Sequence, residues 1–168
     1  MAVELLTALT PIIPGQQDSL DQTLNDLSTG PKSPFAGVGG THVARWVVLD
    51  RLGIGSRLQP ALLVFTAVFD GPLQGWLTRL RTGLGETADL VWSHCLRWPG
   101  TGDAAAFSRW LLEHRIRHSV PFLAYGEATV ADIEQGLDLR RRLGDFAVRS
   151  QGLAPDALRQ SWRKEFGW

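Results

Sequence analysis

Two runs of residues decide the fold of this chain: THVARWVVLD at positions 41–50 and ALLVFTAVFD at positions 61–70. Valine, phenylalanine, tryptophan and threonine suit a pleated, half-buried surface, so each run predicts a β-strand. The ten residues between the runs are too many for a two-residue turn. We therefore expect an antiparallel hairpin with a long connection. Inside the two runs the polar side chains are His42, Arg45 and Thr66, so we expect any chemistry to involve this sheet.

The segments before and after the hairpin predict further strands and helices. Residues 3–13 are apolar up to Pro14-Gly15 and predict a strand, and residues 18–27 carry leucines at helical spacing. Residues 30–40 are dense in glycine and proline and predict a loop. After Asp70-Gly71-Pro72, with Asp70 as N-cap, helical spacing continues to residue 84, and residues 88–96 predict a strand. The order β-α-β-β-α-β predicts an α+β, ferredoxin-like unit with a four-stranded antiparallel sheet over residues 1–98.

Residues 99–168 predict a mainly helical extension packed on the same domain. Asp103 caps an expected helix that runs to about residue 117, and residues 120–125 form a short extended segment. A helix from residue 129 to about residue 146 and a last short helix from residue 155 to residue 166 complete the chain. With 168 residues and 44% hydrophobic content, the chain can build one substantial core.

The charge balance and the single cysteine restrict the partners and the compartment that we expect. Lys plus Arg equals Asp plus Glu at 17 each, so the chain has no excess of positive charge. We therefore expect no nucleic-acid partner. Cys95 alone cannot form an intramolecular disulfide, and Glu4 stands where a signal peptide would be basic. No uncharged apolar segment approaches the roughly 20 residues of a membrane-spanning helix. The sequence predicts a cytoplasmic protein with no membrane partner.

Three segments carry a resemblance to a known superfamily. They are the strand end TPIIPG at positions 10–15, the strand THVARW at positions 41–46 and the strand end FDG at positions 69–71. With these segments, residues 3–98 resemble the dimeric α+β barrel superfamily, in which two ferredoxin-like sheets face each other around a cavity. The superfamily includes dye-decolourising peroxidases, chlorite dismutases, haem-degrading monooxygenases and cofactor-free antibiotic-biosynthesis monooxygenases. The chain also resembles uncharacterised proteins with a His-Phe-Ala-Arg-Trp strand, from which it departs at Val43; that resemblance implies no activity.

Strand alternation predicts which side chains share a cavity. Residues 42, 44, 46 and 48 point to one face, and Trp92 and His94 share a face of the strand expected at 88–96. Joining Trp46 and Trp92 on one side, with His42 and His94, predicts an aromatic-walled pocket. Arg45 then lies beneath the helices, where a guanidinium needs a carboxylate partner or a β-bulge that redirects it.

Three residues are candidates for catalysis, and each has a plainer alternative. His42 can bind a haem iron, donate a proton or orient a substrate, or it can be a structural histidine hydrogen-bonded to backbone. Arg45 can hold a carboxylate or an oxyanion, or form an intramolecular salt bridge. Tyr125 can donate a hydrogen bond in a pocket, or simply to a carbonyl group.

Five residues are candidates for holding a cofactor: Trp46, Trp92, His94, His114 and His118. His94 and Cys95 are strand neighbours that point to opposite faces, so they form a poor nucleophile–base pair. His114 and His118 stand four apart, which places two imidazoles on one helix face. They lack a convincing third metal ligand, so we expect no metal site. One of the two as an axial haem ligand is the better interpretation.

We therefore expect a small oxidoreductase whose aromatic cavity holds a haem or a hydrophobic or aromatic substrate. A cofactor-free monooxygenase or cyclase is an alternative, and a non-catalytic small-molecule binding protein is another. The sheet face bearing Trp46 and Trp92 would be left open, which predicts a homodimer that packs two such faces together. Alternatively, the C-terminal extension covers that face within one chain.

Overall fold

The computed structural model describes residues 3–51, 57–117 and 122–167. These residues form two compact units, residues 1–130 and residues 131–168. The first unit contains the sheet and the helices packed on it, and the second consists of a helical hairpin. Among the described residues, no helix combines the length and the apolar character that crossing a membrane requires.

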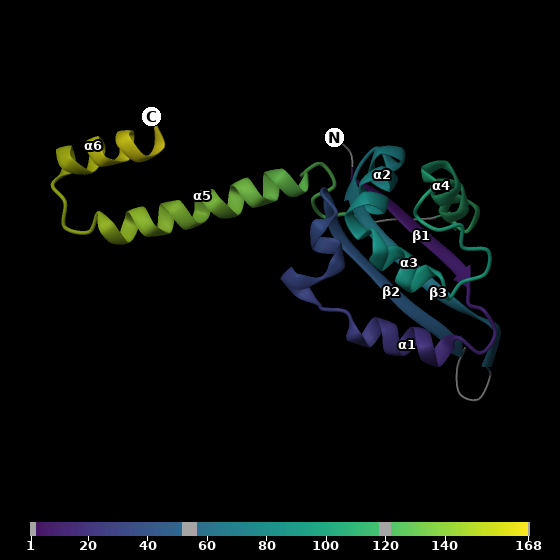
Figure 1. Ribbon diagram of the computed structural model, residues 1–168. Coiled ribbons are helices and arrows are strands. Elements are labelled where there is room, and N and C mark those ends of the chain that lie inside the picture. Colours follow the sequence, from purple (N-terminus) through teal and green to yellow (C-terminus); the bar gives the residue numbers. More distant parts are fainter. Residues whose placement is uncertain (1–2, 52–56, 118–121, 168) are drawn as a thin grey trace. The chain divides into compact units, whose positions relative to one another are not determined.

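The sheet has three strands, β1 (Val3–Pro11), β2 (Thr41–Arg51) and β3 (Arg57–Asp70). β3 lies in the middle and pairs antiparallel with both neighbours, in the order β1-β3-β2. The long strands β2 and β3 form the hairpin that the sequence predicts (Figure 1). The pairing of β2 with β3 is irregular between Thr41 and Val43 and again between Leu49 and Arg51.

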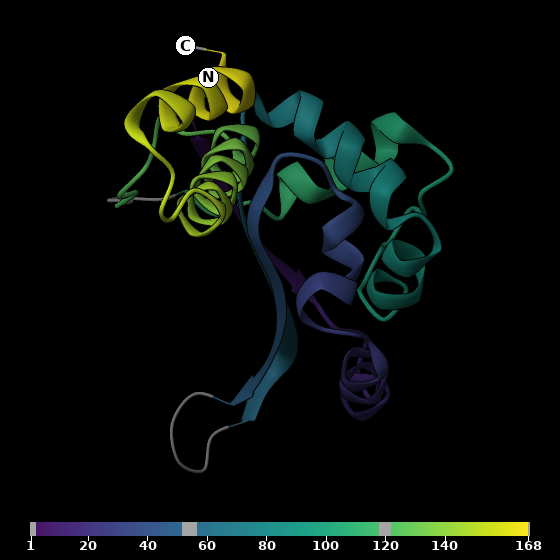
Figure 2. The ribbon, with the colours of Figure 1, turned by 90° about the vertical axis from the view of Figure 1, so that its left-hand side faces the viewer.

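Four α-helices of the first unit lie on one side of this sheet (Figure 2). Each has an apolar side at helical spacing, as helix α2 shows with Trp76, Leu77, Leu80 and Leu84 all buried. Two short 3-10 helices, Gly30–Lys32 and Pro34–Gly37, occupy the expected loop. The α-helices are α1 (Gln17–Asp26), α2 (Leu73–Leu84), α3 (Glu86–Trp92) and α4 (Ala104–Glu113).

The core is aromatic and centres on Phe65 of β3. The Phe65 ring lies 5.3 Å from the ring of Trp92, 6.0 Å from Trp46 and 6.3 Å from Trp76, measured between centroids. Trp76 also donates a 2.9 Å hydrogen bond from Nε1 to Oγ1 of Thr41, which fixes α2 to the first residue of β2. Burying side chains of this size contributes about 2–3 kcal/mol each.

The strand predicted at residues 88–96 is wrong, because most of that segment is helix α3. Its buried residues Ala88, Val91 and Trp92 follow helical spacing, and a short apolar run does not distinguish the two periods. The outer edge of β1 is bridged instead at two points, where Ile12 pairs with Cys95 and Ala8 pairs with Arg115. The fold is α+β with a three-stranded sheet, and the fourth ferredoxin-like strand is not formed among the described residues.

The C-terminal helices are largely as the sequence predicts. Asp103 caps α4 by accepting hydrogen bonds from the backbone N–H groups of Ala105 and Ala106. Helices α5 (Val130–Arg149) and α6 (Pro155–Phe166) follow. The expected N-cap of α2 is wrong, because residue 72 occupies that position without a side-chain cap. The Asp70 carboxylate has other partners, described below.

We expect Phe65→Ala to lower the free energy of unfolding by about 3–5 kcal/mol, because it removes the ring that Trp46, Trp76 and Trp92 all contact. Val43→Ala, at a side chain 58% exposed on the other side of the sheet, serves as the control and should cost less than about 1 kcal/mol. Urea unfolding followed by circular dichroism measures both. Equal losses would contradict the assignment of the two faces.

Candidate functional site

The side of the sheet away from helices α1 to α4, which we call the open face, carries a row of polar side chains across its middle. Thr7 of β1 pairs with Thr66 of β3, and Thr66 pairs with Arg45 of β2. The Arg45 guanidinium is exposed and donates from Nε to Oγ1 of Thr66 at 3.2 Å. The three side chains thus form one cross-strand row that ends in a positive charge.

The rows on both sides of this polar row are apolar. Val43 and Val47 are 58% and 41% exposed, and the other members are partly exposed. Large apolar patches on a protein surface mark binding sites or interfaces. The apolar rows are Leu5–Val68–Val43 on one side, and Leu9–Val64–Val47 followed by Pro11–Leu62–Leu49 on the other.

The two faces of β2 are the reverse of the sequence prediction. Trp46 packs against the core with Ala44 and Val48, whereas Arg45 is on the open face. Trp46 and Trp92 do lie together, with ring centroids 5.5 Å apart, but Trp92 is fully buried and Trp46 packs against the aromatic core. The reason is that helices α2 and α3 supply apolar surface that the bulky rings fill, while the guanidinium remains in water.

His42, near the start of β2, is hydrogen-bonded to Asp70 at the end of β3. Nε2 of His42 lies 2.9 Å from Oδ1 of Asp70, and both side chains are largely buried, at 15% and 12% exposed. The second carboxylate oxygen accepts a 3.1 Å hydrogen bond from the backbone N–H of Val130. The Asp70 carboxylate therefore contacts both the His42 ring and the backbone at residue 130.

The backbone around this pair is tightly held. The guanidinium of Arg79 donates to the carbonyl oxygens of Asp70 and Gly39, each at 2.9 Å. Gly40 has a φ of +74°, and a Cβ at this position would lie 3.2 Å from Oδ2 of Asp70. Glycine is therefore required there on both conformational and steric grounds. Asp70 joins the start of β2, the end of β3 and residue 130 at one point.

The other predicted site residues lie apart from this pair. Nδ1 of His94 is 3.0 Å from Oε1 of Gln16, and Nδ1 of His114 is 2.8 Å from the carbonyl oxygen of Trp110. Tyr125 is 78% exposed. His118 lies outside the described residues.

Predicted site residues line two of the pockets in the first unit. One, of about 320 Å³, is lined by His114 together with Arg97, Arg109 and Trp110. The other, of about 260 Å³, lies beside Arg45, Trp46 and Phe35. The second is smaller than the 300–1,000 Å³ typical of small-molecule sites.

The predicted haem ligands and pocket walls do not come together. His42, His94 and His114 bind different partners, and Trp92 is fully buried in the core. These residues therefore do not fit a haem as a set. Within the described ranges, no group of three or more His, Cys, Asp or Glu residues could hold a metal ion.

Cys95 is buried next to Thr10, whose Oγ1 is 3.3 Å from the sulfur. Burial raises the pKa of the Cys95 thiol to about 11, although the Thr10 hydrogen bond opposes part of this shift. The thiol is therefore protonated at neutral pH. Cys95 packs in the core and is not an activated nucleophile.

The polar row was not predicted from the sequence. Its members are ordinary strand residues, and only the pairing register brings Thr7 and Arg45 to opposite sides of Thr66.

Comparison of the chain with protein families, with curated proteins and with solved structures finds no match. The resemblance to the dimeric α+β barrel superfamily stays a prediction.

We expect the His42–Asp70 pair to be energetically coupled. Asp70→Ala should lower the free energy of unfolding by about 2 kcal/mol, because it leaves His42 and the Val130 N–H group without their acceptor. Unfolding of His42→Ala, Asp70→Ala and the double variant in urea at pH 7 gives the coupling energy, which should be about 1 kcal/mol. Additive single losses would show that the pair contributes nothing.

Cys95 should resist thiol reagents in the folded protein at pH 8. Because its pKa of about 11 lies above the ordinary value of 9.0, far less thiolate is present than in the unfolded chain. We expect the reaction with Ellman's reagent to be at least about a hundredfold slower in buffer than in concentrated urea. Comparable rates would place the thiol at the surface.

Proposed function

We propose that this chain binds small hydrophobic molecules that carry an anionic group, and that the open face is the binding surface. The observation that supports this proposal is the row of Thr7, Thr66 and Arg45 between apolar rows. Of the functions weighed from the sequence, this is the small-molecule binding protein. The ligand's anionic group lies against Arg45, and its hydrocarbon part lies along the strands.

The chemistry of the polar row suits a carboxylate. A guanidinium offers paired N–H donors that match the two oxygens of a carboxylate. Nε of Arg45 already donates to Thr66, which holds the side chain across the face and leaves its terminal nitrogens for a ligand. The hydroxyl of Thr7, next in the row, can donate a further hydrogen bond.

The apolar rows suit a hydrocarbon chain. Residues of one face recur every two positions along a strand, so successive rows lie about 7 Å apart. From Arg45, a ligand lying along the strands meets the row of Val47 and Val64 and then the row of Leu49 and Leu62. Covering this surface is favourable at about 25 cal/mol per Å² of apolar area.

The charge of Arg45 favours ligand binding at the open face rather than a water-free contact between the open faces of two copies. Such a contact would enclose the guanidinia of two copies in apolar surroundings, and an unpaired buried charge is costly. An anionic ligand neutralises that charge. The homodimer formed by packing two such faces stays a prediction, as do the cytoplasmic location and the oxidoreductase activity, with haem or without a cofactor.

We expect dodecanoate to bind the full chain, and Arg45→Ala to weaken this binding about tenfold through loss of the charged hydrogen bonds. Dodecanol, which has the same chain without the charge, should bind both proteins equally. Isothermal titration calorimetry measures all four combinations.

Arg140→Ala, at an exposed arginine of α5, is the matched control and should leave dodecanoate affinity unchanged. If Arg45→Ala and Arg140→Ala bind dodecanoate as tightly as the unmodified chain, Arg45 is not the anion-binding residue. If dodecanoate does not bind at all, the proposed function is wrong.

A further inference from the structure

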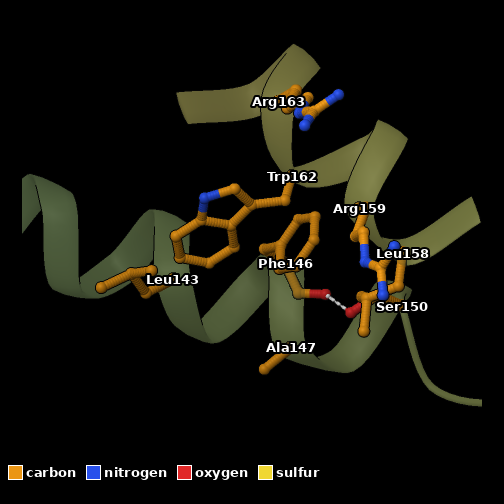
Figure 3. A pocket seen from close by; sticks show the side chains of 8 residues that line it. All are labelled: Leu143, Phe146, Ala147, Ser150, Leu158, Arg159, Trp162 and Arg163. Atoms are coloured by element: carbon orange, nitrogen blue, oxygen red, sulfur yellow. Dashed lines mark hydrogen bonds between the residues drawn. The ribbon is translucent and has the colours of Figure 1, made fainter. Parts of the chain in front are cut away.

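Helices α5 and α6 of the second unit enclose an open groove of about 660 Å³. Its floor is apolar, and Figure 3 shows the rings of Phe146 and Trp162 next to each other at its centre. The centroids of these two rings are 5.4 Å apart. Two arginines, Arg159 and Arg163 of α6, complete the lining together with Leu143, Ala147, Ser150 and Leu158.

The helical hairpin of α5 and α6 leaves most of its apolar side chains exposed. Of the described residues in the second unit, Phe146 alone is buried. Trp162 is 39% exposed and Leu137 is 57% exposed. Helical pairs are stabilised chiefly by burying an apolar side against further elements, and within the described second unit only α5 and α6 contribute to such burial.

The sequence of the hairpin contains one pattern twice, with opposite charge. On α5, the apolar residues Ile133 and Leu137 are each followed by an acid, Glu134 and Asp138. On α6, the apolar residues Leu158 and Trp162 are each followed by a base, Arg159 and Arg163. In both helices the spacing is four residues, so each pattern forms one apolar stripe flanked by one charged stripe.

The charged residues of the pattern are open to a new partner. Within the described part of the chain, Arg163 and Glu134 have no ion-pair partner. Arg159 lies 3.5 Å from Asp156, where both side chains are largely exposed, at 74% and 97%. Asp138 pairs with Arg141 three residues along the same helix, also in an exposed position. Exposed pairs of this kind contribute little and are readily exchanged.

We infer that the groove binds the first half of α5 from a second copy of this chain. The two helices run antiparallel, so that Ile133 faces Trp162 and Leu137 faces Leu158 of the other copy. Glu134 and Asp138 then lie beside Arg159 and Arg163. The same contact forms twice around a two-fold axis, which gives a four-helix homodimer.

This interface uses no residue of the sheet, so it is independent of the proposed ligand site. Antiparallel helix pairs gain their orientation from such flanking charges. A parallel arrangement, or an unrelated apolar ligand in the groove, would not need the acidic pair on α5.

A disulfide between copies tests this contact directly. In a Cys95→Ser background, one chain carries Leu137→Cys and a second, distinguishable chain carries Leu158→Cys. Mixing the two under oxidising conditions should give a covalent dimer of twice the 18.5 kDa chain mass. Leu139→Cys, on a different side of α5, replaces Leu137→Cys as the control and should give at least about tenfold less dimer.

Charge exchange gives the second readout. Arg159→Glu with Arg163→Glu in the Leu158→Cys chain should lower the disulfide yield about tenfold. Glu134→Lys with Asp138→Lys in the partner chain should restore it, because the attraction is then reversed. Arg140→Glu with Lys164→Glu makes the same change of net charge outside the pattern and should have no effect.

Three results would overturn the inference: no covalent dimer, an equal yield from Leu139→Cys, or no restoration by the reversed charges. The covalent dimer that contains one of each distinguishable chain joins position 137 to position 158, so its yield reports this contact whatever other contacts the chain makes. Dodecanoate affinity, measured on the same variants, should stay unchanged, which separates this result from the outcome for the ligand site.

Discussion

The packing of Phe65 against three tryptophans is the interaction on which the first unit depends. Phe65 lies on the central strand, and its ring contacts Trp46 from β2, Trp76 from α2 and Trp92 from α3. This contact fixes which face of the sheet the helices cover. Because side chains alternate along a strand, it also fixes the residues left on the other face. The position of Arg45 in an apolar surface follows from the position of its neighbour Trp46.

Much of the fold can be predicted from the sequence, and the exceptions have physical causes. The β2–β3 hairpin is predictable because long runs of β-branched and aromatic residues favour strands over helices. Helix α4 is predictable because Asp103 caps it. Residues 88–96 mislead because Ala88, Val91 and Trp92 satisfy helical spacing within a run that also suits a strand. The sheet faces are misassigned because a tryptophan fits a pocket wall or a core equally well until its neighbours are known.

The candidate site is less predictable than the fold. His42 and Arg45 stand out as polar residues in an apolar run, and both have defined partners, Asp70 and Thr66. Those partners come from β3, and their pairing depends on register, which a single sequence does not specify where the turn between the two strands is long. The two units carry different surfaces. The first has a polar row that ends in Arg45 on a sheet, and the second has two helices with the same apolar pattern and opposite charges.

Cysteine labelling along β2 tests the central assignment most directly. In the Cys95→Ser background, single cysteines replace Val43, Ala44, Val47 and Val48 in turn. The structure predicts that positions 43 and 47 react quickly with a maleimide and that positions 44 and 48 react slowly. Dodecanoate should slow the reaction at position 47, over which the hydrocarbon chain of the ligand lies. Fast reaction at positions 44 and 48, or no protection by dodecanoate at position 47, would contradict the open face as the binding surface.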